Sequence, residues 1–323
     1  NEHLFILRAS ESYLDQVYLY FLLQFSEVRR ILNRKITGSA QPGLNSSFVK
    51  KFPIELPSLD EQKKIAEILL SVDDVVENTQ TQINKLSDLK TATMNELLTK
   101  GIGHTEFRDS ELGLIPATWE TKKLGEVIQG FQNGFAFSSS GYVSEGTPIL
   151  SLVNISLEGV YKFDPLTEKK WKPSDQKDLE KYLVRNGDLI IAMTDVTPTM
   201  ELIGRGVLVK RKQDSLLNQR VGLIRTGDQV SSKFLAYLFN GNRWRTYSKV
   251  SASLGAQANL GTEAIKDGFV QLPPLDEQEK IADILTSLDD QIEVVEFKLL
   301  QLESLKKSLM QDLLTGKVRV KAA

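Results

Sequence analysis

An internal repeat constrains the fold of this chain more than any other feature of its sequence. The segment that starts at Leu56 reads LPSLDEQKKIAEILLSVDDVVE and the segment that starts at Leu272 reads LPPLDEQEKIADILTSLDDQIE, identical at 15 of 22 positions with an offset of 216. Isolated matches at the same offset pair Leu19 with Leu235, Arg29 with Arg245, Gln41 with Gln257, Leu44 with Leu260 and Leu97 with Leu313. Because a repeat is one structural unit used twice, residues 1–107 correspond to residues 217–323. Residues 108–217 have no earlier counterpart, so we expect the first copy to lack its N-terminal part.

Each copy of the repeated motif begins a long amphipathic helix. Ser58 and Glu61 form a capping-box pattern before the first helix, whereas the second copy has Pro274 in place of the serine and keeps acids in its first turn. Apolar residues then recur in alternating steps of four and three, the heptad spacing of a coiled coil. The predicted coiled-coil positions are Ile65, Leu69, Val72, Val76, Ile83 and Leu86 in the first helix, with Thr79 in register, and Ile281, Leu285, Leu288, Ile292, Val295, Leu299 and Leu302 in the second. Packing of each helix on its own domain is the alternative, and the identical register of the two copies favours mutual pairing.

The length of the helices favours an antiparallel pair. From Glu61 to Leu98 a helix spans ~57 Å at 1.5 Å per residue. The roughly 165 residues between the helices form a domain with a radius of gyration of ~15 Å, which is too small to bridge that distance between its own termini. In an antiparallel pair the first helix ends beside the start of the second, and the intervening domain connects neighbouring points.

The intervening residues predict a mixed domain, and the chain as a whole an α+β fold. Strand candidates are 149–155, 188–193, 206–209 and 221–225, separated by the turn signals Asn133-Gly134, Ser140-Gly141, Asn186-Gly187 and Asn240-Gly241. One helix is predicted from Ser232 to about Ser248, capped by Ser231 or Ser232, and its repeat partner from Asp15 to about Leu32. The predicted division is 1–57 for the remainder of a first domain, 58–107 for the first helical region, 108–272 for a second domain, and 273–323 for the second helical region and a tail.

Charge is distributed unevenly between the domains and the helices. The chain carries a net charge of −2, but the helical segments 58–100 and 274–316 carry −3 and −6, while segments 1–57 and 108–272 carry +2 and +3. A DNA backbone is attracted to the mildly basic domains and repelled by the acidic helices. The composition excludes a strongly basic, chromatin-like protein, and it suits contact with DNA through two separate domains.

Basic residues beside aromatic ones mark the candidate nucleic-acid surface. They surround Trp171 and Trp244, form a run at 210–212, and recur in the first copy at Arg29-Arg30 and Arg34-Lys35. Arginine hydrogen-bonds guanine edges and glutamine or asparagine hydrogen-bonds adenine, and two such amides lie in a glycine-bearing loop. The candidate DNA-binding residues are Lys169, Lys170, Lys172, Arg205, Lys210, Arg211, Lys212, Arg220, Arg243, Arg245, Lys249, Gln257 and Asn259. The alternative for any single cluster is an ordinary solvated face.

Most catalytic sites are excluded by residue types that the chain lacks. There are no cysteines, and the two histidines, His3 and His104, are 101 positions apart, which leaves little room for thiolate, zinc or histidine chemistry. No phosphate-binding loop, GxGxxG or Asn/Asp-Pro-Pro-aromatic motif occurs. Asp164 with Glu168 and Lys170 resembles a nuclease carboxylate cluster only faintly. No apolar run approaches the ~20 residues of a membrane helix and no export signal opens the chain, so we expect a cytoplasmic protein with no catalytic residues, no metal site and no cofactor of its own.

The doubled LPxLDEQxKIAxIL motif, followed in both copies by a heptad helix and the tripeptide LLT, resembles the specificity subunit of type I restriction–modification enzymes. Segment 106–125, the tripeptide at 187–189 and the loop with Gln257 and Asn259 resemble the same family more weakly. The resemblance covers essentially the whole chain. It implies two target recognition domains, each reading one half of a bipartite site in double-stranded DNA, and two conserved helical regions that form an antiparallel coiled coil between them.

The resemblance also implies partners. Two methylation subunits, which carry the S-adenosylmethionine site, dock on the helical scaffold, and motor–nuclease subunits are further partners in this family. The chain is then expected to be a non-catalytic subunit of a type I site-specific deoxyribonuclease and DNA adenine methyltransferase, with an incomplete first recognition domain. The alternatives are a coiled-coil scaffold without a nucleic-acid role and a self-contained methyltransferase, for which the adenine-binding motif is missing. The salt dependence of DNA binding distinguishes the scaffold from the specificity subunit.

Overall fold

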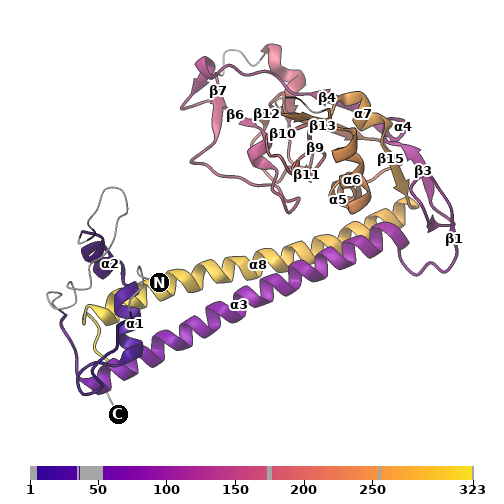
Figure 1. Ribbon diagram of the computed structural model, residues 1–323. Helices are drawn as coiled ribbons and strands as arrows, with labels where there is room; N and C mark the ends of the chain where they lie inside the picture. The colour runs from indigo at the N-terminus through magenta and orange to yellow at the C-terminus, as the bar shows by residue number, and fades with distance from the viewer. Residues whose placement is uncertain are drawn as a thin grey trace. The chain divides into compact units, whose positions relative to one another are not determined.

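The computed structural model describes residues 6–34, 36, 54–172, 177–253, 255 and 257–321. The chain divides into two compact units: unit 1 comprises Asn1–Ser87 and Asp290–Ala323, and unit 2 comprises Asp88–Asp289. Two long helices, α3 (Leu59–Lys100) and α8 (Leu275–Leu314), contribute to both units (Figure 1). This mixture of long helices and sheets confirms the predicted α+β class. Lys35, Gln41 and Leu44 lie outside the described residues.

Each unit combines a globular part with stretches of both long helices, so the units do not test the predicted division into four segments. Among the helices that the structure describes, none is both long enough and apolar enough to cross a membrane.

The described strands of unit 2 form two larger sheets and three short ribbons (Figure 1). The antiparallel four-stranded sheet has the order β11 (Gly206–Leu208), β9 (Leu189–Ala192), β13 (Val221–Thr226), β4 (Ile128–Asn133). The five-stranded sheet has the order β5 (Tyr142–Val143), β7 (Lys169–Trp171), β6 (Thr147–Leu150), β12 (Ser215–Leu217), β8 (Leu183–Val184), with β12 and β6 parallel. The ribbons pair β1 (Phe107–Arg108) with β2 (Ile115–Pro116), β3 (Glu120–Lys123) with β15 (Phe269–Leu272), and β10 (Thr194–Asp195) with β14 (Ala258–Asn259). The shorter helices of unit 2 are α4 (Leu124–Val127), α5 (Ser232–Leu238), α6 (Asn242–Ser251) and α7 (Thr262–Asp267), with 3₁₀ turns at Ser139–Gly141, Leu152–Asn154 and Lys177–Tyr182.

Strand β9 is buried on both of its faces. Leu189 and Ile191 pack in a cluster with α5, α6, α7 and the adjoining ends of the long helices. Ile190 and Ala192 pack in a second cluster with residues of the five-stranded sheet. Because successive side chains of a strand point to opposite faces, the four-stranded sheet is the middle layer between the helices and the other sheet.

Unit 1 packs α1 (Gln16–Gln24) and α2 (Ser26–Asn33) against the start of α3 and the end of α8. Its core contains aromatic and aliphatic residues of α1, among them Tyr18 and Phe21, together with Ile65 of α3 and Leu313 of α8. The Asp15 carboxylate caps α1 by accepting hydrogen bonds from the Val17 and Tyr18 N–H groups at 2.9 and 2.8 Å.

Within each unit, α3 and α8 run antiparallel. In unit 1 the Lys306 ammonium lies 2.5 Å from the Asp73 carboxylate, so an early residue of α3 meets a late residue of α8. In unit 2 the Lys90 ammonium lies 2.5 Å from the Asp289 carboxylate. The second pair is the repeat equivalent of the first with the two helices exchanged, because Asp289 lies 216 positions after Asp73 and Lys90 lies 216 positions before Lys306. The predicted antiparallel pairing is therefore confirmed within each unit, and each of the predicted coiled-coil positions is buried or half-buried.

A buried glutamine anchors the start of α8 to the rest of unit 2. Gln278 is 1% exposed. Its side-chain oxygen accepts from the Ser231 N–H at 2.9 Å, and its amide nitrogen donates to the carbonyls of Gln229 and Pro273 at 3.3 and 2.9 Å. These bonds tie the first turn of α8 to the N-terminus of α5, where the Ser231 hydroxyl is also the predicted helix cap.

The equivalent glutamine makes the same bonds in unit 1. Gln62 is also 1% exposed. It accepts from the Asp15 N–H at 2.9 Å and donates to the carbonyls of Tyr13 and Pro57, both at 2.9 Å. Each partner lies 216 positions before its counterpart in unit 2, so the two units share one anchoring arrangement, which we call the glutamine clamp.

A buried glutamate next to each clamp binds the chain that leaves the other long helix. The Glu61 carboxylate accepts two hydrogen bonds from the Arg319 guanidinium at 2.7 and 2.6 Å and one from the Val320 N–H at 3.2 Å. The Arg319 hydrogen bond is the main cause that holds the pKa of Glu61 below its ordinary value, although burial opposes it. This pair ties the tail that follows α8 to the first turn of α3.

Glu277 has the corresponding place in unit 2 but different partners. Its carboxylate accepts from the Ile102 N–H at 2.9 Å and the Trp119 indole N–H at 3.1 Å, and it lies 2.8 Å from the His104 ring nitrogen. Gly101 is required here, because its φ is +67° and a Cβ would lie 2.5 Å from the Glu277 carboxylate. The chain that leaves α3 is therefore held at the first turn of α8.

The prediction of one continuous helix from Ser232 to about Ser248 is wrong. The chain forms α5 and α6 instead, separated at Asn240-Gly241. The cause is the buried Asn240 amide, which donates to the carbonyls of Gly206 and Ala236, both at 2.7 Å, and so binds the end of α5 to β11. The repeat partner is likewise two helices, because Phe25 between α1 and α2 has an extended backbone.

Two further expectations differ from the structure in detail. The strand predicted at 149–155 ends at Leu150, because Ser151 and Asn154 form a capping box around a 3₁₀ turn. Ser58 accepts from the Glu61 N–H at 3.3 Å as predicted, but the Glu61 carboxylate binds Arg319 instead of completing the box. The strands predicted at 188–193, 206–209 and 221–225 are confirmed as β9, β11 and β13.

The clamp predicts a specific loss of stability. Gln278→Ala leaves one N–H and two carbonyl groups unpaired in a buried site, so the free energy of unfolding of unit 2 should fall by about 1–3 kcal/mol. All three tryptophans, Trp119, Trp171 and Trp244, lie in unit 2, so urea unfolding followed by their fluorescence reports this unit. Glu279→Ala, at an exposed position of α8 in the same unit, is the control and should change stability by less than about 0.5 kcal/mol. Equal effects of the two substitutions would contradict the role of the clamp.

Candidate nucleic-acid interface

Polar side chains gather at the edge of the four-stranded sheet where β9 ends and β13 begins. The Met193 N–H donates to the Arg220 carbonyl at 3.0 Å, and the Leu260 N–H donates to the Met193 carbonyl at 2.8 Å. Asn259 lies opposite Thr194 in the β10–β14 ribbon. The turn before β13 therefore lies beside the loop that contains β14. We call Gln219, Arg220, Gln257 and Asn259 the Arg220 edge.

The side chains of the Arg220 edge are available to an external partner. Gln219, Arg220 and Asn259 are exposed and Gln257 is half-buried. Within the described residues, none of the four side chains forms a hydrogen bond or an ion pair. Guanidinium and amide groups are those that bind guanine and adenine edges in the major groove. Sequence reasoning missed Gln219, since its place beside the loop depends on the connection from β12 to β13.

Asp195 supports the loop next to this edge. It is 1% exposed, and its carboxylate accepts from the Thr197 N–H at 2.7 Å and the Leu202 N–H at 2.6 Å. Burial alone raises the pKa of this carboxyl, but the hydrogen bonds from Thr197 and Leu202 outweigh it and hold the pKa below its ordinary value. A charged Asp195 therefore fixes the loop that follows β10.

The lysine clusters lie at the opposite end of β9. The Arg211 N–H donates to the Asn186 side chain at 3.0 Å, and residue 209 pairs with the turn before β9. Lys169, Lys172, Lys210 and Lys212 are exposed and Lys170 is half-buried. Four strand residues at ~3.3 Å each separate the two ends of β9 by about 13 Å. The structure thus brings segments 169–172 and 210–212 together and places the Arg220 edge apart from them.

Arg211 joins these two segments through an ion pair. Its guanidinium binds the Glu168 carboxylate and lies 4.7 Å from the centre of the Phe163 ring. Burial alone lowers the pKa of Arg211, and the Glu168 hydrogen bond reverses that effect, so the pKa is raised. Both acids of the faint nuclease-like cluster therefore have partners inside the protein: Glu168 pairs with Arg211, and the Asp164 carboxylate accepts a hydrogen bond from the Leu166 N–H at 2.9 Å. In the described part of the chain, no group of three His, Cys, Asp or Glu side chains is placed to hold a metal ion.

Arg245 has a different place from the one predicted. It is 7% exposed, and its guanidinium donates to the backbone carbonyls of Met200, Glu201 and Ile203. Burial is the main cause that lowers the pKa of Arg245 to about 10, and the nearby Arg205 adds to it. A contact with DNA requires breaking these bonds, so the structure corrects the prediction: Arg245 holds the 200–203 loop.

Three other predicted cations are also engaged inside unit 2. The Arg205 guanidinium donates to the Glu201 carbonyl at 2.6 Å and to the Asn240 side chain at 3.2 Å. The Lys249 ammonium lies 2.7 Å from the Glu201 carboxylate. The Arg243 guanidinium donates to the Leu114 carbonyl at 2.8 Å, and burial lowers its pKa. These internal bonds compete with a contact to DNA, and the DNA contacts predicted for Arg205, Arg243 and Lys249 stay predictions.

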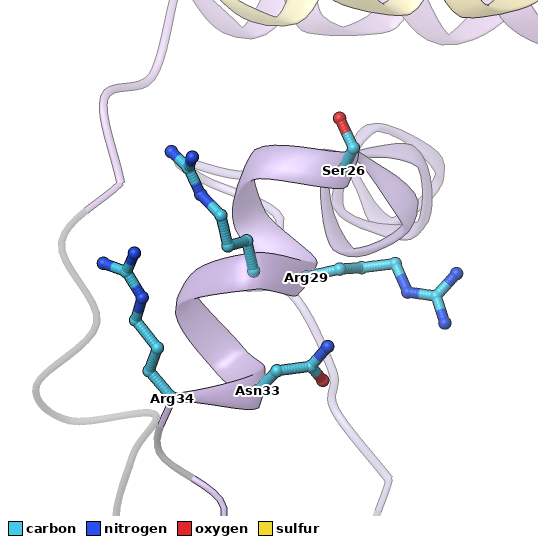
Figure 2. Close-up of a pocket in the computed structure, with 5 residues that line it drawn as sticks. Ser26, Arg29, Asn33 and Arg34 are labelled. Carbon is cyan, nitrogen blue, oxygen red and sulfur yellow. The ribbon is translucent and has the colours of Figure 1, made fainter.

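The arginines of α2 in unit 1 remain exposed. Ser26, Arg29, Arg30, Asn33 and Arg34 line a shallow hollow of about 510 Å³ (Figure 2). Figure 2 shows Arg29 and Arg34 leaving α2 on different sides, each with its guanidinium extended away from the helix. Within the described residues, none of these three arginines forms an ion pair.

Paired substitutions separate structural from surface arginines. Arg245→Ala removes the donor of the Met200 and Ile203 carbonyls and one of the two donors of the Glu201 carbonyl, which Arg205 still serves, so the free energy of unfolding of unit 2 should fall by about 2–4 kcal/mol. Arg220→Ala, at an exposed position, should change it by less than about 0.5 kcal/mol. Urea unfolding measured by tryptophan fluorescence checks both. A stable Arg245→Ala variant would show that this arginine is free for another role.

Comparison with known proteins places the chain in a family. The family model for the type I restriction modification DNA specificity domain matches residues 1–88 and 116–304. The type I restriction enzyme MjaVIII specificity subunit of Methanocaldococcus jannaschii is 30% identical over 98% of this chain and 73% of its own length. The putative type I restriction enzyme MjaX specificity subunit of the same organism is 32% identical over 99% of this chain and 72% of its own length.

Solved structures agree in fold. The S subunit of a type I restriction-modification system from M. genitalium has a TM-score of 0.59 at 16% identity, over 94% of this chain and 74% of that one. A chain from a study of complex assembly and conformational transition of the type I R-M system also has a TM-score of 0.59, at 17% identity, over 95% of this chain and 73% of that one. Since the family model matches most of the residues and a relative 30% identical is covered over more than two thirds of its length, the chain belongs to the type I restriction–modification DNA specificity family.

Proposed function

We propose that this chain is the specificity subunit of a type I restriction–modification complex and reads a bipartite site in double-stranded DNA. The observation that carries the proposal is the Arg220 edge, where neighbouring backbone segments present one guanidinium and three amide side chains that have no hydrogen-bond or ion-pair partner among the described residues. Base edges are read by this combination of groups. Buried arginines such as Arg245 are already saturated, so the free side chains at this edge are the better candidates for base contacts.

The exposed lysines at the other end of β9 suit a second kind of contact. Lys169, Lys172, Lys210 and Lys212 present mobile positive charges without fixed geometry, which suits phosphates more than bases. We assign them to the DNA backbone. The acidic outer faces of α3 and α8 repel DNA and suit protein partners instead.

The assembly follows from the same proposal. Two methylation subunits, which supply S-adenosylmethionine, dock on the paired helices, and motor–nuclease subunits join where restriction occurs. This chain then selects the sequence in the cytoplasm and leaves methyl transfer and cleavage to its partners. Its own sequence has neither a phosphate-binding loop nor the Asn/Asp-Pro-Pro-aromatic motif.

DNA binding by the assembled complex tests the proposal. The site is first identified by mapping methylated adenines in a host that carries the intact system, and affinity is then measured against salt. For six to ten phosphate contacts, the affinity should fall by about 10³-fold or more between 50 and 200 mM salt. Arg220→Ala should cost about 1–3 kcal/mol on the cognate site and relax one base position. DNA binding that is absent, or that ignores salt, would favour the coiled-coil scaffold instead.

We further propose that the length of α3 and α8 sets the gap between the two half-sites. In unit 1 the Asp73–Lys306 ion pair fixes which residues of the two antiparallel helices lie opposite each other. Leu86 lies 13 residues after Asp73 and Glu293 lies 13 residues before Lys306, so these two residues also lie opposite each other. Insertions after Leu86 and after Ile292 therefore lengthen both helices at one level. An insertion of three heptads, 21 residues in total, lengthens each helix by about 31 Å. This length is close to one DNA turn of ~34 Å.

The paired 21-residue insertion should lengthen the preferred spacer by about nine base pairs at ~3.4 Å each and leave both half-site sequences unchanged. A matched control with the insertion in α3 alone should unpair the helices and bind poorly. The measurement is selection of bound sequences from a library with a variable spacer. An unchanged spacer would mean that the helices do not set the gap, and changed half-sites would mean that the helices read bases.

A further inference from the structure

The outer face of α2 carries positive charge that its repeat counterpart in unit 2 lacks. At the offset of 216, Arg30 corresponds to Thr246 of α6 and Arg34 to Val250. Arg30, Arg34 and Thr246 are exposed, and Val250 is 81% exposed. In unit 2 this face stays open although Trp244, Arg245 and Ser248 of the same helix are buried. The exposure of Arg30 and Arg34 in unit 1 therefore agrees with the exposure of the equivalent residues in unit 2.

Arg29 on the same helix belongs to a different group. Its counterpart, Arg245, is buried and donates to backbone carbonyls of the 200–203 loop. Arg29 lines the hollow in unit 1 but sits at a position that serves packing in unit 2. We therefore restrict the site to the two arginines whose counterparts face outward.

The place of this face in unit 2 connects it with the Arg220 edge. Helix α6 ends at Ser251, one residue after Val250, and the Ser253 N–H then donates to the Asn259 carbonyl at 2.9 Å. Val250 thus lies three residues before a hairpin that carries Asn259 of the Arg220 edge. By the repeat, Arg34 has the corresponding place at the end of α2 in unit 1.

The chemistry of the pair suits an oxyanion ligand. Residues four apart on a helix have Cβ atoms about 5–6 Å apart, so both guanidinium groups can reach one phosphate or two adjacent ones. Asn33 and Ser26 line the same hollow and add neutral hydrogen-bonding groups (Figure 2). Glu27 is the acidic residue of this helix, and within the described residues it pairs with neither arginine.

We propose that Arg30 and Arg34 bind the phosphate backbone of DNA and that unit 1 thereby contributes affinity that is independent of sequence. This inference rests on the proposed function, because it assigns the ligand of unit 1 to the same DNA. Phosphate contacts position a protein on the duplex without reading bases. Unit 2 has a threonine and a valine at the equivalent positions, so the two units contribute unequally to the salt-dependent part of binding.

The test compares the wild-type chain, assembled with its methylation subunits, with the R30A/R34A double variant on a duplex of arbitrary sequence. Loss of two phosphate contacts should reduce the slope of log affinity against log salt by about 1.8, so the fall between 50 and 200 mM salt becomes about 12-fold smaller. At each salt concentration, binding to the mapped cognate site should weaken by the same factor as binding to the arbitrary duplex, so the ratio of the two affinities should stay unchanged. R30K/R34K should keep the wild-type slope, because the charge is retained.

The T246A/V250A variant is the matched control at the equivalent positions of unit 2 and should keep the wild-type slope. Circular dichroism and thermal unfolding of R30A/R34A should match the wild type, since both side chains are exposed. An unchanged slope in R30A/R34A, with DNA binding by the wild type intact, overturns this inference and leaves the proposed function standing. A loss confined to the cognate site overturns it as well, since the pair then reads bases. A wild-type complex that does not bind DNA overturns the proposed function first.

Discussion

A side-chain amide buried at the first turn of a long helix must find partners for both of its polar atoms, and this requirement organises both units. Gln62 and Gln278 meet it with backbone groups from the segment before the adjacent short helix. Because a buried amide without partners is costly, the start of each long helix is fixed against its unit. The neighbouring Glu61 and Glu277 then fix the chain that arrives from the other long helix.

Charge alone does not show which basic side chains of this molecule are free to bind a partner. Arg205, Arg245 and Lys249 were all predicted to contact DNA, yet Arg205 and Arg245 donate to backbone carbonyls of the 200–203 loop and Lys249 pairs with the Glu201 carboxylate. Arg220 has no such partner among the described residues, although it is an isolated arginine in the sequence. Arg205, Arg245 and Lys249 differ from Arg220 because the fold places carbonyl or carboxylate oxygens beside them. The sequence around each residue does not show where these oxygens lie.

The repeat and the heptad spacing predicted the architecture because they are periodic and involve many residues. The antiparallel order of α3 and α8 followed from chain length and geometry, and three of the four strand candidates followed from short apolar runs between turns. The break between α5 and α6 depends on one amide, Asn240, reaching β11 from elsewhere in the fold. The roles of Arg243 and Arg245 depend on carbonyls 40 or more residues away, which local patterns do not contain.

The glutamine clamp also bears on how such a protein can change over generations. All partners of Gln62 and Gln278 are backbone groups, namely carbonyls, which every residue supplies, and one N–H, which every residue except proline supplies. Genetic recombination between the two copies of the repeated motif joins a new upstream segment to an unchanged helix start. The hybrid retains every clamp bond if the new segment follows the same backbone path and has no proline at the N–H donor position. The surface that faces DNA is therefore free to be exchanged as a module, while the scaffold that presents it is inherited intact.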